Sequence, residues 1–282
     1  RGRRLQQRQA STRRAEGNPE MNGQDKDTQA ARPSLGRRLL IVLATVTGNV
    51  YLVFGSVFFG GLAVLIGWIP PRGRVVFEIA RLWSQLLLLS SFTRVEAEFE
   101  SEIETAERYV FMANHQSLYD IPALLCTLPV QARFLAKRSL FQIPFFGWGL
   151  KAGGFISIDR HDRSSAGKSF AHAVEEMKHG ASTLVYPEGS RTLDGKVLPL
   201  ERGGFLLALK AELPIVPVGI RGSLQVQKRT SFAVRPGTIR VRYGTALDPM
   251  EYGLRRKDDL TDHVRHEIAR LAETALADEA AD

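Results

Sequence analysis

The sequence predicts an α/β protein with a mostly parallel central sheet flanked by helices, preceded by a membrane-inserted helical hairpin. Two observations predict this class. The segment from Leu39 to Ile69 carries no charged residue, and from about residue 94 strand-like segments alternate with helix-like ones. The chain therefore divides into a disordered basic tail (1–36), a membrane-associated helical segment (37–93) and an α/β domain with a C-terminal helix (94–282).

The α/β domain is predicted from the spacing of short apolar runs. Strands are expected at 95–99, 108–113, 132–137, 154–159, 182–187, 214–220 and 238–244, and helices at 117–127, 164–179, 203–211 and 257–278. In a parallel sheet of this kind, functional groups gather beyond the carboxyl ends of the strands. Polar residues that directly follow a predicted strand are therefore the candidates for a site.

The apolar segment is too long for one straight span. Its 31 residues would reach about 46 Å at 1.5 Å per residue, whereas a hydrocarbon core is about 30 Å thick. Gly48-Asn49 and Gly60-Gly61 offer places to bend, and arginines flank both ends. Because loops rich in arginine stay on the cytoplasmic side, a hairpin or re-entrant insertion is favoured over a single tilted span. We expect a location at the cytoplasmic face of the inner or plasma membrane.

The next segment, residues 75–92, keeps its charges on one stripe. This pattern suits an amphipathic helix at the membrane interface or over the α/β domain, and an ordinary core helix fits equally well.

The positive charge lies mostly in the tail. Residues 1–38 contain ten Lys or Arg against four Asp or Glu, so they carry +6 of the net charge of +8. A polar, cationic tail without apolar periodicity favours disorder and attraction to lipid headgroups. A nucleic-acid partner is not expected, because the charge is not on the folded part. The single cysteine, Cys126, sits in an apolar run and reads as a small buried hydrophobe.

A histidine and an aspartate follow the second predicted strand. In "ANHQSLYD", His115 would lie at the carboxyl edge of the sheet and Asp120 one turn into a helix. The carboxylate could hold one imidazole N–H and leave the other nitrogen as a base for a hydroxyl proton. Two alternatives remain open: Ser117 and Asp120 also have the form of a helix-capping box, and a metal site is the weaker reading because no second ligand is nearby.

A tight turn follows the strand that ends at Val185. "YPEGSRT" places Glu188, Gly189, Ser190 and Arg191 in the turn, where Arg191 could bind phosphate oxygens. Ser190 is a poor nucleophile candidate because the G-x-S-x-G pattern is absent.

A basic and aromatic stretch lies between these two motifs. Cations from it could join Arg191 in an anion site with an apolar wall beside them, as a phosphate-bearing lipid would need. The cations are Lys137, Arg138 and Arg160, and the aromatic residues are Phe141, Phe145, Phe146 and Trp148.

Together, four motifs resemble the glycerolipid acyltransferase family, of the PlsC or lysophosphatidic acid acyltransferase type. The family pattern N-H-x-S-x-x-D matches residues 114–120, G-x-I-x-x-D-R matches 154–160, F/Y-P-E-G-[ST]-R-[ST] matches 186–192, and an apolar P-[IV]-[VI]-P-V matches 214–218. The motifs follow the family order and cover roughly residues 113–219.

The resemblance implies transfer of a fatty acyl group from a thioester to the sn-2 hydroxyl of lysophosphatidic acid. His115 would be the base, Asp120 would orient it, and no acyl-enzyme would form. The oxyanion would be stabilised by donors such as backbone N–H groups near the first motif. The remaining members of the implied substrate-binding set are Asn114, Ser117, Lys137, Arg160, Glu188, Gly189, Ser190 and Arg191.

The resemblance also sets the expected partners. They are membrane phospholipids, a lysophospholipid acceptor and an acyl donor, either acyl-CoA or acyl carrier protein, with no metal or redox cofactor. The alternatives are another acceptor (glycerol 3-phosphate, another lysophospholipid or a lyso-aminolipid), a thioesterase that uses water, and a lipid-binding protein without catalysis. The intact set of motif residues argues against the last.

Overall fold

The computed structural model describes residues 34–67, 73–158 and 163–274. These residues build a seven-stranded sheet with the order β1-β7-β6-β2-β5-β3-β4, in which neighbouring strands are parallel except β6 and β7. The strands are β1 (Thr93–Phe99), β2 (Val110–Ala113), β3 (Ala132–Lys137), β4 (Ile156–Ile158), β5 (Ser182–Val185), β6 (Ile215–Arg221) and β7 (Gly237–Tyr243).

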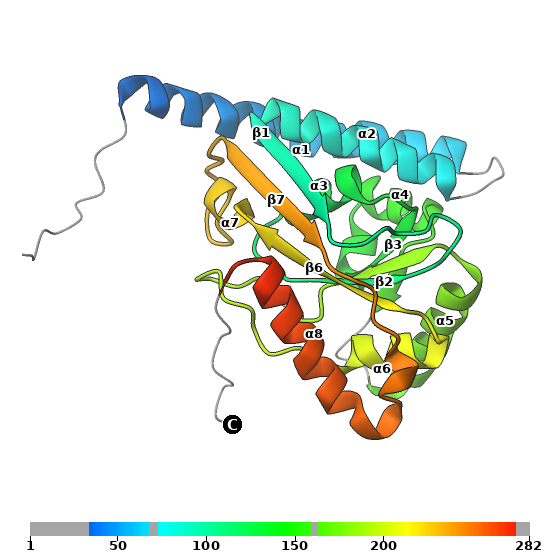
Figure 1. Cartoon of the computed structure of the whole chain (residues 1–282). Coiled ribbons are helices and arrows are strands. Elements are labelled where there is room, and N and C mark those ends of the chain that lie inside the picture. The colour runs from blue at the N-terminus through cyan, green and yellow to red at the C-terminus, as the bar shows by residue number, and fades with distance from the viewer. Residues whose placement is uncertain (1–33, 68–72, 159–162, 275–282) are drawn as a thin grey trace, which may run out of the picture. The chain divides into compact units, whose positions relative to one another are not determined.

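Helices cover both faces of the sheet (Figure 1). The longer ones are α1 (Leu35–Ile66), α2 (Arg74–Ser90), α3 (Asp120–Thr127), α5 (Arg163–His179), α6 (Arg202–Ala211) and α8 (Lys257–Leu271). The shorter ones are α4 (Phe146–Ala152), α7 (Ser223–Val226) and the 3₁₀ turns η1 (Arg138–Gln142), η2 (Pro249–Glu251) and η3 (Leu254–Arg256).

Alternate residues of the central strands enter two separate cores, as the period of two of a strand requires. On β2, Phe111 and Ala113 join the core under α2 and α3, whereas Val110 and Met112 join the core formed with α5, α6 and α8. All four are buried completely. The central strands are therefore apolar on both faces, which is typical of a parallel sheet between two helical layers.

The α/β prediction is confirmed. Each predicted strand overlaps an observed one, and each predicted helix overlaps α3, α5, α6 or α8. The short helices α4 and α7 were not predicted. Residues 1–33 of the predicted tail (1–36) lie outside the described residues. Leu35 and Gly36, at the end of that range, belong to the start of α1.

The predicted bends inside the apolar segment are wrong, because α1 is one unbroken helix of 32 residues. Its glycines serve close packing instead. A Cβ on Gly60 would lie 2.6 Å from the carbonyl oxygen of Phe145, and a Cβ on Gly48 would lie 3.1 Å from the hydroxyl of Tyr119. The residues that α1 buries are all small: Ala44, Gly48, Gly55 and Ala63. They allow the helix to lie directly on the α/β domain.

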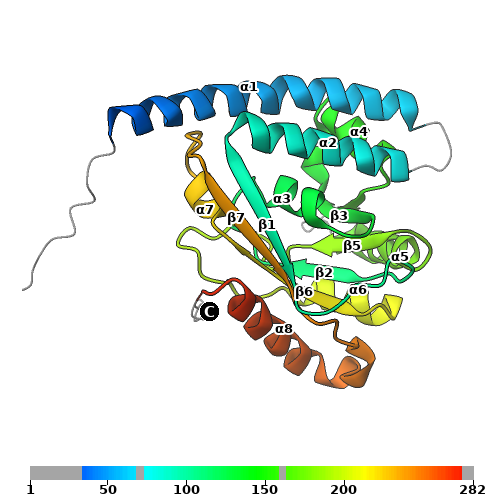
Figure 2. The ribbon, with the colours of Figure 1, turned by 45° about the horizontal axis from the view of Figure 1, so that its top comes forward.

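α1 and α2 run antiparallel along the same side of the sheet (Figures 1 and 2), so the two helices pair with each other, whereas the hairpin was predicted within residues 39–69. The connecting residues 68–72 lie outside the described residues. α2 buries Phe77 and Leu87 in the core shared with α3. It therefore covers the α/β domain, which is one of the arrangements predicted for residues 75–92.

Most of the surface of α1 that faces away from the domain is apolar. Large hydrophobic residues there are exposed along the whole helix, among them Leu39, Val46, Phe54 and Leu65. Within the described residues, α1 is the helix that is long and apolar enough to cross a membrane. Its composition and exposure indicate membrane association.

Candidate active site

His115 and Asp120 meet where β2 gives way to α3, at the carboxyl edge of the sheet. The imidazole Nδ1 lies 2.8 Å from Oδ2 of Asp120. A carboxylate oxygen can only accept here, so Nδ1 carries the hydrogen and Nε2 keeps its lone pair. The His115 side chain is 17% exposed, whereas Asp120 is completely buried. One ring nitrogen is thus fixed inside the protein and the other is left without a protein partner in the described part.

Asp120 also organises the turn that carries His115. Its Oδ2 accepts the backbone N–H groups of Gln116 at 2.7 Å and Ser117 at 2.8 Å. The bond back to Ser117 N–H is one half of a capping box, so the capping and the catalytic interpretations apply to the same carboxylate. In the other half, Ser117 Oγ accepts from Tyr119 N–H rather than from that of Asp120.

The ring of Tyr186 supports the imidazole from one side. The two rings stack with centroids 4.0 Å apart and an angle of 17° between their planes. Tyr186 directly follows β5, the strand next to β2. Burial, and then the negative charge of Asp120, raises the pKa of the Tyr186 phenol well above its usual value, so it stays neutral beside the pair.

The main chain of His115 is held by the turn after β5. His115 N–H donates to Glu188 Oε1 at 2.7 Å, and His115 C=O accepts from Thr192 N–H at 2.9 Å. The second oxygen of Glu188 accepts from Leu198 N–H at 3.0 Å. Burial raises the pKa of Glu188 to about 7, although these two N–H bonds oppose the rise.

Two more predicted binding residues have their polar groups occupied by backbone. The Asn114 amide accepts from Ile220 N–H at 2.7 Å and donates to Ile220 C=O at 2.9 Å. Ser117 Oγ donates to the carbonyl of Gln227 at 2.8 Å. Both residues therefore hold the first motif against β6 and the chain that follows it.

The occupied N–H groups also correct the expectation for the oxyanion. The N–H groups of His115, Gln116 and Ser117 all bind carboxylates within the protein. They are not available to a tetrahedral intermediate in this arrangement.

Arg191 and Arg229 bring two cations to the same edge. Arg229 Nη1 donates to the carbonyl of Arg191 at 2.9 Å. Burial, and then the nearby Arg229 charge, lowers the pKa of Arg191, while Asp120 opposes this shift. Neither guanidinium has a carboxylate partner among the described residues. Gly189 takes the positive φ of 70° that the turn requires, and Ser190 is exposed.

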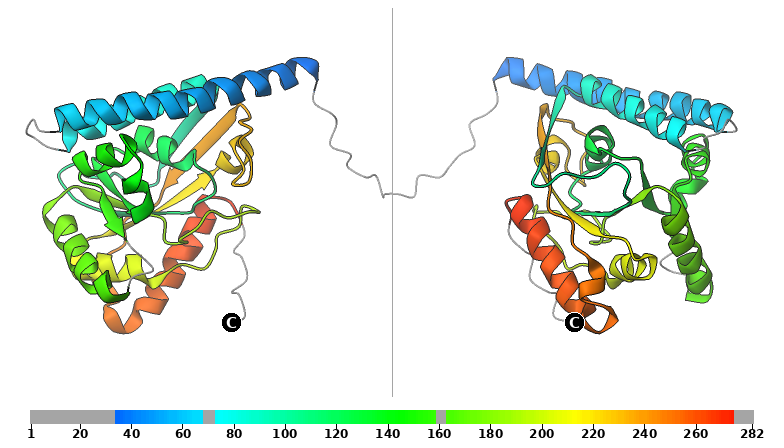
Figure 3. Two further views of the ribbon diagram at one scale, coloured as in Figure 1. Left: turned by 180° about the vertical axis from the view of Figure 1, so that it is seen from behind. Right: turned by 45° about the vertical axis from the view of Figure 1, so that its right-hand side comes forward.

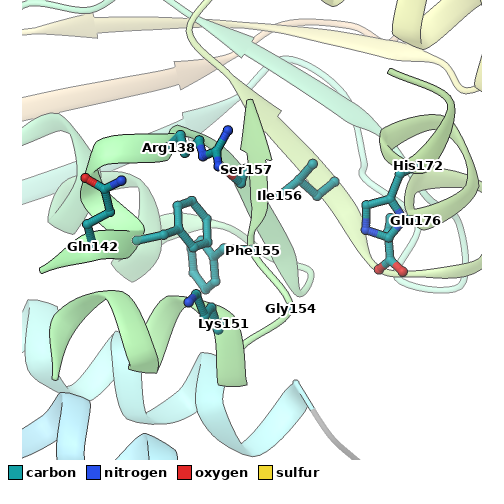
Figure 4. Close-up of a pocket in the computed structure, with 10 residues that line it drawn as sticks. Arg138, Gln142, Lys151, Gly154, Phe155, Ile156, Ser157, His172 and Glu176 are labelled. Atoms are coloured by element: carbon teal, nitrogen blue, oxygen red, sulfur yellow. The ribbon is translucent and has the colours of Figure 1, made fainter. Parts of the chain in front are cut away.

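The other predicted cations are less closely gathered. Lys137 is exposed at the end of β3, on the same sheet edge. Arg160 lies outside the described residues. Arg138 lines a separate cavity of about 510 Å³ beside the edge strand β4, together with Lys151, His172 and Glu176 (Figure 4).

An apolar cavity of about 170 Å³ adjoins the end of the first motif. Leu118 and Tyr119, which directly follow the His115 turn, line it together with residues of α1, α2 and α4. The predicted aromatic wall is divided: Phe146 faces this cavity, whereas Phe145 and Trp148 are exposed.

The arrangement offers a base with an orienting carboxylate, adjacent cations and an apolar cavity. Sequence reasoning missed Arg229 and Gln227, which lie in no motif. The sequence around them is cationic, contains one phenylalanine and has no apolar periodicity. Nothing in this local pattern connects Arg229 to Arg191, which lies 38 residues earlier in the chain.

Comparisons with known proteins identify the family of the chain. The family described as Acyltransferase matches residues 94–221. A 1-acyl-sn-glycerol-3-phosphate acyltransferase of Pseudomonas aeruginosa is 32% identical over 212 residues, covering 73% of this chain and 80% of the relative. The chloroplastic enzyme of Brassica napus is 30% identical and covers 68% of this chain.

The chain spans about half the length of the first plant relatives, 54% for the Brassica enzyme and 48% for that of Arabidopsis thaliana. Among solved structures, the 1-acyl-sn-glycerophosphate acyltransferase PlsC of Thermotoga maritima superposes with a TM-score of 0.73 at 25% identity, over 84% of this chain and 96% of that one. On its fold, its motif geometry and these likenesses, the chain belongs to the 1-acyl-sn-glycerol-3-phosphate acyltransferase family.

Proposed function

We propose that this protein transfers a fatty acyl group from an acyl thioester to the free sn-2 hydroxyl of lysophosphatidic acid, which gives phosphatidic acid for phospholipid synthesis. One observation carries the proposal: the 2.8 Å His115–Asp120 pair leaves Nε2 open, and the turn bonded to the His115 carbonyl carries Arg191, which with Arg229 lacks a carboxylate partner in the described part. The printed names of the Pseudomonas and Thermotoga relatives support the same acceptor.

The transfer proceeds without an acyl-enzyme. Nε2 of His115 takes the proton of the acceptor hydroxyl as its oxygen attacks the thioester carbonyl carbon. The tetrahedral intermediate then collapses, the C–S bond breaks, and the thiolate takes the proton from the imidazolium. Asp120 stabilises that imidazolium and fixes its tautomer. This mechanism needs neither a metal nor a redox cofactor, because His115 transfers the proton and no group is oxidised or reduced.

The acceptor phosphate lies at Arg191 and Arg229. A guanidinium group binds phosphate through paired N–H donors, and two neighbouring cations favour an anion between them. Lys137, at the same sheet edge, is a further candidate. Asn114, Ser117 and Glu188 act indirectly in this account, because their polar groups hold the backbone around His115.

The fatty chain occupies the apolar cavity beside Leu118 and Tyr119. Since α1 and α2 form two of its walls, the cavity lies next to the membrane-associated surface. The donor is acyl-CoA or acyl carrier protein, both of which present a thioester to the same base.

We place α1 flat in the cytoplasmic leaflet. It contacts the α/β domain from Thr45, which bonds Val234, to Gly67, which lies against Ala152. A helix in contact with a folded domain along about 33 Å leaves no room for a bilayer between them. Arg37 and Arg38 in the first turn of α1 and Arg74 at the start of α2 favour the cytoplasmic side.

Acceptor competition tests the proposal. Purified protein in detergent receives a labelled thioester with lysophosphatidic acid, glycerol 3-phosphate or lysophosphatidylcholine. We expect labelled phosphatidic acid as the dominant product. Product from another acceptor would move the assignment to that acceptor, and free fatty acid formed without any acceptor would indicate a thioesterase.

The phosphate site is tested by Arg191→Ala and Arg229→Ala. Loss of a charged hydrogen bond is worth about 1.5–3 kcal/mol, so the KM for lysophosphatidic acid should rise roughly 10- to 100-fold while the KM for the donor stays nearly constant. Arg255→Ala, an exposed arginine in η3, is the matched control. An equal rise in both KM values would show that these residues are structural.

A further inference from the structure

The loop from Gln227 to Pro236, with the sequence QKRTSFAVRP, belongs to none of the four motifs. It connects α7 to β7 and carries Phe232, whose side chain is 86% exposed, more than any other large hydrophobic residue described. Lys228, Arg229 and Arg235 are exposed around it, and the loop has no acidic residue. An exposed phenylalanine among cations is unfavourable in water and typical of an interfacial contact.

The 227–236 loop is fixed to the membrane helix. Asn49 Nδ2 donates to the carbonyl of Phe232 at 2.9 Å. Thr45 Oγ1 accepts from Val234 N–H at 3.0 Å and lies 3.2 Å from its carbonyl. Figures 1 and 3 show the loop reaching the flank of α1. Phe232 therefore stands beside the exposed apolar face of α1.

The same loop is fixed to the active site. The carbonyl of Gln227 accepts from Ser117 Oγ at 2.8 Å, and Arg229 donates to the carbonyl of Arg191 at 2.9 Å. Ten consecutive residues thus contact α1, the turn that carries His115 and the turn that carries Arg191.

We propose that the 227–236 loop is a second membrane contact that binds an anionic lipid surface. Phe232 enters the interface next to α1, and Lys228 and Arg235 pair with lipid phosphates. The continuity with the apolar face of α1 and the all-cationic rim favour lipid over an acidic protein as the partner. This membrane contact does not depend on the proposed function. We also propose that the contact brings the acceptor to Arg191, and this second step rests on the proposed function.

Fluorescence quenching in vesicles tests the contact. Phe232→Trp is compared with Leu254→Trp in the full-length protein, each bound to phosphatidylcholine vesicles. The vesicles are prepared with and without phosphatidylglycerol, and each kind is prepared with and without brominated lipid. Leu254 is a matched control because it is 52% exposed and is followed by Arg255 and Arg256. It precedes α8, which covers the opposite face of the sheet from α1 (Figure 1). Because the chain has three tryptophans of its own, the wild-type signal is subtracted from that of each variant.

We expect bromine near the headgroups to quench the added emission of the Phe232→Trp variant and to leave that of the Leu254→Trp variant unchanged. The charge contribution is tested in the Phe232→Trp background, with Lys228→Glu or Arg235→Glu added. In vesicles with phosphatidylglycerol, each added change should weaken this quenching, because the partition of the protein onto the vesicles falls about fivefold or more per charge. Absence of quenching in the vesicle-bound Phe232→Trp variant would overturn the proposal. Equal quenching with and without phosphatidylglycerol would overturn the anionic-lipid assignment.

A third result would identify a different partner. If the charge reversals raise the KM for an acyl carrier protein donor and leave quenching unchanged, the loop binds that protein and the lipid proposal is wrong. The quenching signal requires no turnover, so a protein that fails to acylate lysophosphatidic acid still reports on the loop.

Discussion

The imidazole of His115 is held from three directions. Asp120 fixes Nδ1, the ring of Tyr186 fixes the plane, and the Glu188 and Thr192 contacts fix the main chain. Each constraint acts on a different part of the residue, so the open Nε2 has a defined position before substrate arrives. Such preorganisation is what makes a general base efficient.

Asp120→Asn should separate the charge of this residue from its hydrogen-bond geometry. An asparagine oxygen in the place of Oδ2 can still accept from Gln116 N–H, Ser117 N–H and His115 Nδ1–H, but it is neutral and stabilises the imidazolium less than a carboxylate does. We expect a fall in kcat of roughly 10²- to 10⁴-fold with the donor KM nearly constant. The measurement is steady-state transfer together with the melting temperature. A variant with normal kcat would show that the charge of Asp120 does not contribute to the transfer.

Glu188 should make stability depend on pH. Its pKa of about 7 in the folded protein exceeds the ordinary 4.5, so the folded state binds a proton more tightly. Stability should therefore fall as pH rises from about 4.5 through 7, by at most about 3 kcal/mol for this buried group.

The check is the difference in melting temperature between the wild type and Glu188→Gln. Relative to the variant, the wild type should lose stability between pH 5 and pH 8. A difference that does not change with pH would contradict the assignment.

At the scale of elements, α1 acts as part of the α/β domain rather than as a separate anchor. Small residues let its backbone approach Tyr119 and Phe145, and residues of α1 line the apolar cavity that Leu118 and Tyr119 also line. The docking of α1 therefore shapes this apolar cavity, in which we propose that the fatty chain lies.

Two adjacent glycines of α1 provide a matched test. A Cβ at position 60 would lie 2.6 Å from the Phe145 carbonyl oxygen, whereas at position 61 the nearest atom, Phe145 Cδ1, is 3.9 Å away. Both changes to alanine improve helix propensity by about 0.5–1 kcal/mol. Gly60→Ala should nevertheless lower the melting temperature and the activity, at a cost of about 1–3 kcal/mol, whereas Gly61→Ala should be neutral or stabilising. Equal behaviour of the two variants would mean that α1 does not pack on α4 as described.

At the scale of the whole molecule, the proposed flat placement of α1 puts the active site at the surface of one leaflet. α1 lies along the domain, Leu118 and Tyr119 after the His115 turn line the apolar cavity, and the turn that carries Arg191 is bonded to the His115 main chain. An amphiphilic acceptor could then enter from the leaflet with its phosphate at Arg191 and its chain in the cavity.

The depth of α1 in the bilayer can be measured. Val42→Cys, Val50→Cys and Val57→Cys, at three exposed positions of α1, would each carry a fluorophore for depth-dependent quenching. Burial raises the pKa of the native Cys126 to about 11, so it should react slowly. A flat helix gives one shallow depth at all three sites. A crossing helix would change depth by roughly 22 Å between the first and the last.

Local patterns were sufficient for much of this molecule. Alternation and apolar runs predict the strands of the sheet, and the strand ends predict that His115 and Glu188 lie at its carboxyl edge. They failed where the cause is tertiary: Gly60 reads as a bend until Phe145 is seen against it, and Arg229 has no role until it is seen on Arg191. α4, a seven-residue helix with two glycines, is shorter than any periodicity can reveal.

The most direct test of the account is transfer by His115→Ala. Wild type and variant, purified in the same detergent, receive a labelled acyl thioester and lysophosphatidic acid, and phosphatidic acid is measured over time beside the melting temperature. We predict a rate at least roughly 10²-fold lower in the variant, an unchanged fold and no label on either protein. Near-normal phosphatidic acid formation by a folded His115→Ala protein, or a stable acyl-enzyme in the wild type, would contradict direct transfer by this base.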